Sequence, residues 1–338
     1  MENVSWCDRE MKESFFEPFY DGVLILLSIL TVAINLLVMC AFAKRSQLHT
    51  KTNTLLVSLS VSDFLMGLLG IPSNIVCNVT AGCANWLCIS SVVMYRLTAT
   101  STIYHIFAIT VERYISVLHP LNYFSLVTRP RICRAIAAIW GFALLIAFIQ
   151  LSWTDFSNFS SGLSASPLRL KLALAYDAFG TLVCFLLPTI AMGFIYFRMF
   201  RVIRRQSVAI KRLHVLNENH QSSCISTAEV RAIAIFALML GIFVCCWMTF
   251  YISVFQIYTN YYGVLSEGYI KLFDFLRFST AFLNPLLYTF LKHDFRFTLR
   301  QMFSCCVISR SEQNAFRTEE TPMVTQELQE RNSTLNHA

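Results

Sequence analysis

Charged residues are scarce in this chain. Asp, Glu, Lys and Arg make up 14% of its 338 residues, whereas hydrophobic residues make up 56% and the mean hydropathy is +0.55. A soluble globular protein does not need so much apolar composition to bury its core. The composition therefore excludes an ordinary soluble protein and predicts an all-α membrane protein that crosses the bilayer several times.

The sequence also lacks the marks of an enzyme. It has no internal repeat, no glycine-rich loop of the enzyme type and no combination of nucleophile, base and oxyanion donors that would indicate hydrolysis. Its twelve cysteines are scattered through apolar segments without metal-ligand spacing. Most of them are therefore expected to be small buried hydrophobic residues, and we predict neither enzyme activity nor an enzymatic cofactor.

The amino-terminal segment, residues 1–19, lacks the basic and apolar regions of a cleavable signal peptide, so the first helix itself would direct insertion. The net charge of +7 could suggest nucleic acid as a partner. The basic residues instead cluster in alternate loops, which indicates membrane orientation. We predict a multi-pass plasma membrane protein with an extracellular amino terminus, a cytoplasmic carboxyl terminus and no nucleic-acid partner.

The chain contains seven apolar segments of membrane length, which form a predicted seven-transmembrane helix bundle over residues 20–291. The segments are residues 22–43, 54–77, 86–118, 132–153, 172–200, 228–258 and 268–291. Residues 292–306 follow as a short amphipathic eighth helix with Cys305 and Cys306 as candidates for palmitoylation, the alternative being two unmodified thiols. Residues 307–338 are polar and are predicted to form a disordered cytoplasmic tail.

Three glycosylation sequons fall on the predicted extracellular side, at Asn3, Asn78 and Asn158. Within the spans, Asp63 lies about midway along an apolar helix, and Arg113 ends another one. Ionisable residues at such positions are functional candidates by default, although Arg113 could simply mark a helix end. His105 is predicted to be a packed or hydrogen-bonded core residue.

Each predicted span carries a marker residue or motif, and the third span carries two. In chain order the markers are Asn35, Asp63, Cys88, Glu112-Arg113-Tyr114, Trp140, Pro188, Trp247 and Asn284-Pro285-x-x-Tyr288. Over residues 20–305 this combination resembles the rhodopsin-like class A G-protein-coupled receptors, nearest to their amine, melanocortin and adenosine-like groups. The resemblance implies a receptor that binds an extracellular ligand and activates a heterotrimeric G protein, with arrestin and receptor kinases acting on the tail.

The resemblance also implies roles for individual residues. Arg113 would be held by Glu112 and Glu229 and, once released, would meet Tyr196 and Tyr288. The full coupling set implied is Glu112, Arg113, Tyr114, Tyr196, Glu229, Asn284, Pro285 and Tyr288. A sodium ion would be held by Asp63, Asn35, Thr102 and Asn284, and a packing switch would consist of Ile103, Pro188, Phe243 and Trp247.

Four departures from the family pattern stand out. The predicted loop of residues 154–171 has no cysteine, so Cys88 is free or pairs with Cys7, Cys77 or Cys83, of which we favour Cys7 or Cys83. Thr249 replaces the usual proline of the sixth helix. Tyr95 replaces the aspartate that binds amines, and Phe278 replaces the opsin lysine, so the chain is neither a standard amine receptor nor an opsin.

The ligand pocket is therefore predicted from the unusual residues of the outer half of the bundle. They are Tyr95, Arg96, Ala99, Tyr176, Asp177, Cys184, Phe250, Tyr251, Asp274 and Arg277. Three interpretations remain open: an ion pair within the bundle that braces the pocket, an arginine clamp for an anionic ligand, and an aspartate with aromatic neighbours for an amine. Two alternatives to a ligand-gated receptor are a receptor-like scaffold and a transporter, although the broken helices and paired repeats of transporters are not visible.

Overall fold

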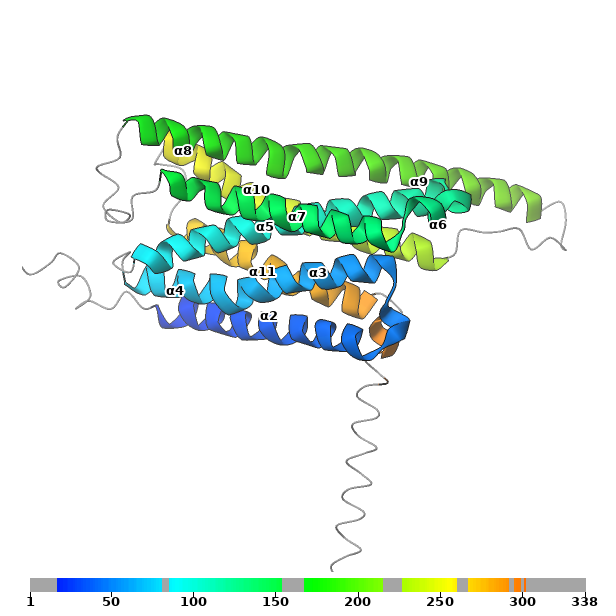
Figure 1. Cartoon of the computed structure of the whole chain (residues 1–338), viewed down its shortest axis with the longest axis horizontal. Coiled ribbons are helices and arrows are strands. Elements are labelled where there is room, and N and C mark those ends of the chain that lie inside the picture. Colours follow the sequence, from blue (N-terminus) through cyan, green and yellow to red (C-terminus); the bar gives the residue numbers. More distant parts are fainter. Residues whose placement is uncertain are drawn as a thin grey trace, which may run out of the picture. The chain divides into compact units, whose positions relative to one another are not determined.

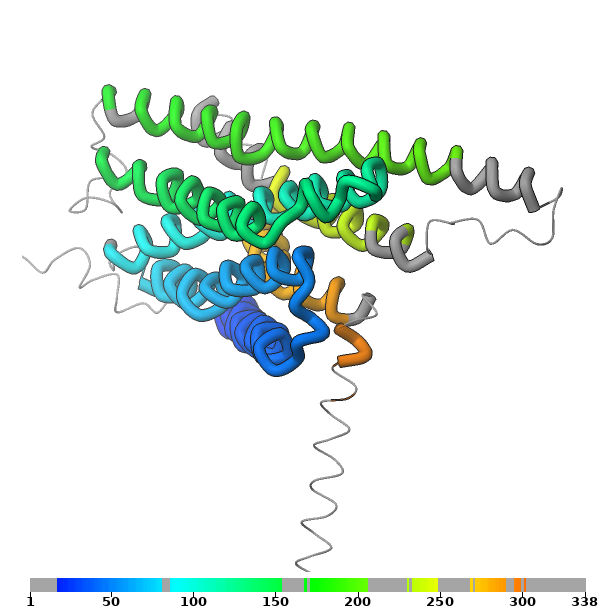
Figure 2. Tube along the Cα trace, turned by 45° about the vertical axis from the view of Figure 1, so that its right-hand side comes forward, coloured from blue at the N-terminus to red at the C-terminus, as the bar shows by residue number. Residues whose placement is uncertain are grey.

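The structure is a computed structural model of the chain that describes residues 17–80, 85–153, 167–214, 227–259, 267–291, 295–298 and 301. The chain divides into two compact units, Met1–Lys292 and His293–Ala338. In the first unit, long helices run side by side (Figures 1 and 2). In the second unit, residues 295–298 are helical. Cys305, Cys306 and the tail lie outside the described residues, so the eighth helix and its lipid anchor stay predictions.

Each of the seven predicted spans corresponds to a helical segment among the described residues, and most segments extend a few residues beyond the predicted ends. The segments are α2 (Pro18–Lys44), α3 (Lys51–Leu65) with α4 (Ile71–Val79), α5 (Asn85–Leu118), α7 (Arg129–Ile149), α8 (Pro167–Gly180) with α9 (Leu187–His214), α10 (Thr227–Thr259) and α11 (Glu267–Leu291). A four-residue helix, α6 (Tyr123–Leu126), lies in the connection between α5 and α7. The predicted helix bundle is confirmed.

Four segments are long and apolar enough to cross a membrane within the described ranges: Pro18–Lys44, Lys51–Val79, Arg129–Ser152 and Lys171–Arg205. A shorter apolar helix, Ile233–Met248, lies within α10. Large apolar side chains such as Ile29 on α2, Leu145 on α7 and Ile190 on α9 are exposed. Such continuous apolar surface is stable in contact with lipid tails and unstable in water, which agrees with a membrane bundle.

Helix α5 occupies the centre of the bundle, where it contacts α3, α4, α7, α9 and α10 (Figure 1). Its apolar side chains Ile89, Val93 and Leu97 pack against Ala143 and Ala147 of α7, which are fully buried. Small residues at this position allow two helix backbones to approach closely, and close approach is the main source of helix association in lipid. The central position explains why α5 carries many of the buried polar residues described below.

Two helices contain a widened π-helical turn just before a proline. Met66–Gly70 precedes Pro72 in the second span, and Thr181–Leu186 precedes Pro188 in the fifth. A proline inside a helix lacks an N–H and crowds the carbonyl one turn earlier, so a wider turn relieves both defects. Gly67 lies where this turn meets α2, because an added Cβ would come within 3.0 Å of Thr31.

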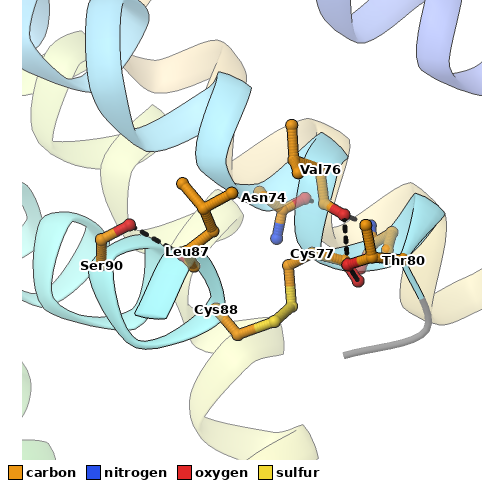
Figure 3. Close-up of a disulfide and its surroundings, with 8 residues drawn as sticks. Asn74, Val76, Cys77, Thr80, Leu87, Cys88 and Ser90 are labelled. Carbon is orange, nitrogen blue, oxygen red and sulfur yellow. Dashed lines mark hydrogen bonds between the residues drawn. A yellow bond between two sulfur atoms is a disulfide. The ribbon is translucent and has the colours of Figure 1, made fainter. Parts of the chain in front are cut away.

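A disulfide joins Cys77 near the end of α4 to Cys88 near the start of α5 (Figure 3). Our preference for Cys7 or Cys83 as the partner of Cys88 is therefore wrong; both of these lie outside the described residues. The connection between the two helices is short, and it brings the two Cα atoms to 4.9 Å, within the range that a disulfide requires. The bridge therefore fastens the second span to the third.

Cys88→Ala is expected to lower the free energy of unfolding by about 2–4 kcal/mol, because a disulfide restricts the unfolded chain. Cys77→Ala should have the same effect, and the double variant should be no less stable than either single variant, since all three lose one bond. Thermal unfolding of the purified protein in detergent measures this. Cys40→Ala, which removes a free cysteine of α2, is the control and should leave the midpoint unchanged; a loss with Cys88→Ala that Cys77→Ala does not reproduce would contradict the pairing.

Candidate functional site

The predicted coupling arginine lies in a buried polar cluster at one end of the bundle. Arg113 Nε donates to Glu112 Oε2 at 2.7 Å, and another nitrogen of its guanidinium donates to the Thr52 hydroxyl of α3. Thr52 in turn donates to Glu112 at 3.1 Å. The ion pair expected between Glu112 and Arg113 is thus present. Its role in coupling stays a prediction.

Glu112 is only 2% exposed, and its second carboxylate oxygen accepts a hydrogen bond from the Tyr123 hydroxyl of α6 at 2.6 Å. Burial, and after it this hydrogen bond, raises the pKa of Tyr123 above its ordinary value, so the hydroxyl keeps its proton. A buried carboxylate is stable only when donors surround it, and three residues supply them here. The cluster therefore ties α5 to α3 and to the connection that contains α6.

The other predicted coupling residues bond elsewhere. The Tyr196 hydroxyl is 2.9 Å from the Thr110 hydroxyl, and the Tyr288 hydroxyl is hydrogen-bonded to Ser60. Pro285 is buried within α11, and Tyr114 is half-buried on α5. The backbone of Glu229 lies in α10, but its side chain is outside the described residues, so the second half of the expected restraint on Arg113 stays a prediction.

The predicted sodium residues come together only in part. Asp63 is 1% exposed, accepts a hydrogen bond from Asn284 at 3.3 Å and is also hydrogen-bonded by Thr102. Asn35 instead donates to the Ala281 carbonyl of α11 at 3.1 Å and to a carbonyl of its own helix. Both named partners of Asp63 are uncharged, so its buried carboxylate needs either a proton or a cation. Oxygen ligands of this kind suit sodium.

Two of the four residues predicted to form a packing switch are in contact, and their switching role stays a prediction. The Phe243 ring stacks on Trp247 with the centroids 5.6 Å apart and the planes at 20°. Phe185, which the sequence did not single out, meets Phe243 at 6.4 Å from the π turn of the fifth span. Ile103 is fully buried, and Pro188 is buried one turn beyond Phe185. The widened turn aims Phe185 toward α10.

Two arginine–aspartate ion pairs lie toward the other end of the bundle, and a third ion pair there joins Lys271 to Glu17. Arg96 of α5 bonds Asp177 of α8 at 2.7 Å, and Arg277 bonds Asp274 on α11 at 2.9 Å. The Tyr95 ring lies between the two arginines, because its centroid is 4.6 Å from the Arg277 guanidinium carbon and 5.7 Å from that of Arg96. The bracing interpretation is thus supported for both arginines.

The structure describes only some of the remaining residues of the predicted ligand pocket. The Arg96 guanidinium carbon lies 4.6 Å from the Tyr176 ring centroid, and the Tyr176 hydroxyl donates to the Ile146 carbonyl of α7. Tyr176 therefore helps to hold Arg96 in place and is itself held by α7. Ala99 and Cys184 are buried. The side chains of Phe250 and Tyr251 lie outside the described residues, so the aromatic neighbours proposed for an amine stay a prediction.

The comparison with known proteins decides the family. Residues 34–288 match the family described as 7 transmembrane receptor (rhodopsin family). The chain belongs to this receptor family. It is 30% identical to the dog (Canis lupus familiaris) histamine H2 receptor over 311 residues, which cover 86% of this chain and 81% of that receptor. It is 27% identical to the chicken (Gallus gallus) adenosine receptor A2b over 303 residues, or 83% of this chain and 86% of that receptor.

Family membership confirms several predictions from the sequence. The human histamine H2 receptor is another relative, 29% identical over 309 residues that cover 86% of this chain and 80% of that receptor. Like the other members, this protein is a multi-pass plasma membrane receptor that couples to G proteins, and it is not an enzyme. Of the three sequons, Asn78 is exposed in the last turn of α4, while Asn3 and Asn158 lie outside the described residues.

Several residues of the receptor's polar clusters escaped the sequence analysis because they are ordinary hydroxyl side chains. Ser58 accepts from Trp140 Nε1 at 3.0 Å and lies 2.8 Å from His105 Nε2. The other ring nitrogen of His105 donates to the Ser101 carbonyl at 2.7 Å, so Ser58 donates to a neutral imidazole. His105 is fully buried and hydrogen-bonded, as predicted. Ser58 belongs to a run of small polar residues within an apolar span, and this run is the sequence feature that could have indicated a buried hydrogen-bonding role.

Breaking one pocket ion pair should destabilise the receptor measurably. Removing one member of a buried pair costs about 3–5 kcal/mol, and because both side chains here are partly exposed, we expect about 1–3 kcal/mol for Arg96→Gln. Adding Asp177→Asn should recover part of that loss, since no charge is then left unpaired. Thermal unfolding of the four receptors in this cycle is the measurement, with Lys171→Gln, an exposed residue of α8, as the control. Additive losses would contradict a pairing of these two side chains.

Proposed function

We propose that this receptor binds a small polar molecule in the outer half of its bundle and responds by activating a heterotrimeric G protein at its cytoplasmic face. The observation that carries this proposal is the cluster around Arg113, whose guanidinium is tied to Glu112 and Thr52. A partly buried charged side chain near a helix end that hydrogen bonds restrain can be released by a movement of the neighbouring helices. Release of Arg113 would open the receptor to the G protein.

The orientation that we propose follows from the basic residues. Lys44, Lys51 and Arg129 lie at helix ends on one side of the bundle, and Arg201 and Arg204 lie on α9 beyond its apolar part. Lysine and arginine concentrate on the cytoplasmic side of membrane proteins. The Arg113 cluster would then face the cytoplasm, and the ion pairs beside Tyr95 would face the outside.

The ligand that we propose is small and charged. The relatives are named for histamine and for adenosine, which are both small polar molecules. In the second ion pair, Asp274 is 28% exposed and Arg277 is 7% exposed, so a positively charged ligand group reaches the aspartate more readily. An amine that takes over Asp274 would leave Arg277 against the Tyr95 ring, and the ion pair would become a sensor of the ligand.

Three further proposals rest on the sequence and the family. A sodium ion would bind at Asp63 with Thr102 and Asn284. The carboxyl-terminal tail would be phosphorylated by receptor kinases and would then bind arrestin. Membrane lipid would hold the amphipathic segment through Cys305 and Cys306.

The coupling proposal is tested by basal signalling, which requires no ligand. Arg113→Ala should abolish basal activation of the preferred G-protein class, and Tyr123→Phe should raise it about tenfold or more. The second effect is expected because a hydrogen bond to a charged group contributes about 1.5–3 kcal/mol to the restraint. Cells that express each variant at equal surface density, with sensors for all main α-subunit classes, measure both. Arg134→Gln, an exposed cytoplasmic change, should leave the signal unaltered. A basal signal that survives Arg113→Ala would contradict the proposal.

The sodium proposal is tested by salt-dependent stability. Sodium chloride should raise the unfolding midpoint of the purified receptor above its value in choline chloride, because an ion that binds only the folded state stabilises it. Asp63→Asn should remove this difference, since the amide carries no charge to hold the ion. Thermal unfolding in the two salts at equal ionic strength is the measurement. A sodium effect of equal size in Asp63→Asn would locate it elsewhere.

A further inference from the structure

The two arginine–aspartate pairs at the end of the bundle away from Arg113 differ in how far solvent reaches them. In one pair, the side chain of Asp274 is 28% exposed and that of Arg277 is 7% exposed. In the other pair, the side chains of Arg96 and Asp177 are 17% and 14% exposed. Asp274 is therefore the charged group of the two pairs that a ligand reaches most readily, and its pair with Arg277 is the one that a ligand can open.

A ligand with a single charge would leave this pair unbalanced. An ammonium group that binds Asp274 takes the carboxylate from Arg277, and a carboxylate that binds Arg277 leaves Asp274 without its cation. A charge left unpaired in a partly buried site opposes binding. A ligand that carries both charges avoids this cost, because each side chain exchanges one partner of opposite charge for another.

The spacing of the pair fits opposite charges that lie close together in a ligand. One terminal guanidinium nitrogen of Arg277 is 2.9 Å from a carboxylate oxygen of Asp274. In an α-amino acid, the ammonium and carboxylate groups are bonded to the same carbon atom, so their charges are similarly close. The planar guanidinium of arginine can also donate to both oxygens of a carboxylate.

Aromatic rings hold Arg277 in position for this exchange. Its guanidinium carbon lies 4.6 Å from the centroid of the Tyr95 ring and 4.9 Å from that of Phe278. The two rings stabilise the positive charge whichever carboxylate it meets. A guanidinium that is already held in place loses little conformational freedom when the ligand binds.

Tyr20 of α2 supplies a further polar group beside the pair. Its hydroxyl oxygen is buried and has no hydrogen-bond partner among the described residues, and Asp274 and Arg277 lie within electrostatic range of it. A buried hydroxyl without a partner gains a hydrogen bond when an acceptor arrives. The second oxygen of a ligand carboxylate is such an acceptor.

The surroundings of the pair favour an apolar ligand side chain. Tyr20, Tyr95 and Phe275 are partly buried and pack against an apolar cluster that joins α2, α4 and α11. The parts of these rings that remain uncovered present apolar surface next to the charged pair. Rings of this kind gain stability by covering aliphatic or aromatic groups.

We propose that the ligand of this receptor is an α-amino acid with an apolar side chain. Its ammonium group binds Asp274, and its carboxylate binds Arg277 and the Tyr20 hydroxyl. This inference rests on the proposed function, a receptor for a small polar molecule, and specifies the class of that molecule. The net charge of the site is the same before and after binding, and every charge of the opened pair has a partner.

Matched probes that differ by one charge test the ligand class. The full-length receptor is purified into lipid nanodiscs, and its thermal unfolding is followed against the concentration of L-phenylalanine, L-tryptophan or L-leucine. Each amino acid is compared with the amine that lacks its carboxylate and the acid that lacks its amine; for phenylalanine these are phenethylamine and hydrocinnamate. At least one amino acid should raise the unfolding midpoint, and its two analogues should bind at least about tenfold more weakly, because each lacks a charged contact.

Each other outcome of this comparison overturns the inference in a different way. An amine that binds as tightly as its amino acid would leave a receptor for amines. An acid that binds as tightly would leave a site for anions. No change of the midpoint with any of the three amino acids would remove the ligand class altogether.

Single substitutions test the three contacts. Arg277→Gln should remove the preference for the amino acid over its amine, and Asp274→Asn should remove the preference over its acid. Tyr20→Phe should weaken binding of the amino acid and the acid several-fold and leave the amine unchanged, because only the carboxylate meets the hydroxyl. Lys271→Gln removes a positive charge one turn away on α11 and should leave these preferences unaltered. A loss of preference with Lys271→Gln equal to that with Arg277→Gln would indicate diffuse attraction and overturn the inference.

A double variant keeps the test valid if a single substitution prevents folding. Asp274→Asn/Arg277→Gln leaves no charge of the pair without a partner, and it should unfold cooperatively but no longer respond to the amino acid. Stabilisation of this variant by the amino acid at the concentrations that stabilise the unaltered receptor would overturn the inference.

Signalling in cells separates this inference from the proposed function. The amino acid that stabilises the purified receptor should raise G-protein activation, and Arg113→Ala should abolish this response without changing binding. Binding without any G-protein response would support the ligand class and contradict the coupling proposal. Basal signalling that depends on Arg113 but does not change with any of the three amino acids would support coupling and overturn the ligand class.

Discussion

A polar side chain inside a helix bundle that lipid surrounds must find its partner on another helix, and much of this structure follows from that constraint. Asn35 donates to the Ala281 carbonyl and so joins the first span to the seventh. Ser60 and Tyr288 join the second span to the seventh through one hydrogen bond. Such bonds contribute modestly to stability, but an unpaired polar group in their place is costly, so they define how the helices meet.

The same constraint explains why the charged side chains at the two ends of the bundle differ in their burial and in their partners. Near one end, Glu112 is buried and satisfied by Arg113, Thr52 and Tyr123, so one carboxylate holds three segments together. Near the other end, the arginines and aspartates form pairs that remain partly exposed. A fully satisfied buried cluster is a restraint, whereas a partly exposed ion pair can exchange a partner for a ligand group.

The departures from the family pattern are consistent with one another. The disulfide from Cys88 reaches Cys77 on the neighbouring helix and leaves Cys88 unavailable to the loop of residues 154–166. Tyr95 occupies the position where amine receptors have an acid, and its ring accepts the Arg277 guanidinium. In this receptor a helix-to-helix bridge and arginine-centred ion pairs thus lie where these departures from the family pattern occur.

The sequence by itself determined the class and the seven spans, because hydropathy and span length are local properties. The pair of Glu112 with Arg113 was expected from the family resemblance, since adjacent residues on a helix do not face each other. It did not determine that Arg96 meets Asp177, since these residues are 81 positions apart and only the packing of α5 against the fifth span brings them together. The partner of Cys88 was likewise wrongly preferred, because several cysteines were compatible with the chain and only the positions of the helix ends distinguish them. The roles of Ser58 and Tyr123 could be assigned only from the structure, because the role of a hydroxyl depends on its hydrogen-bond partner and the sequence does not identify that partner.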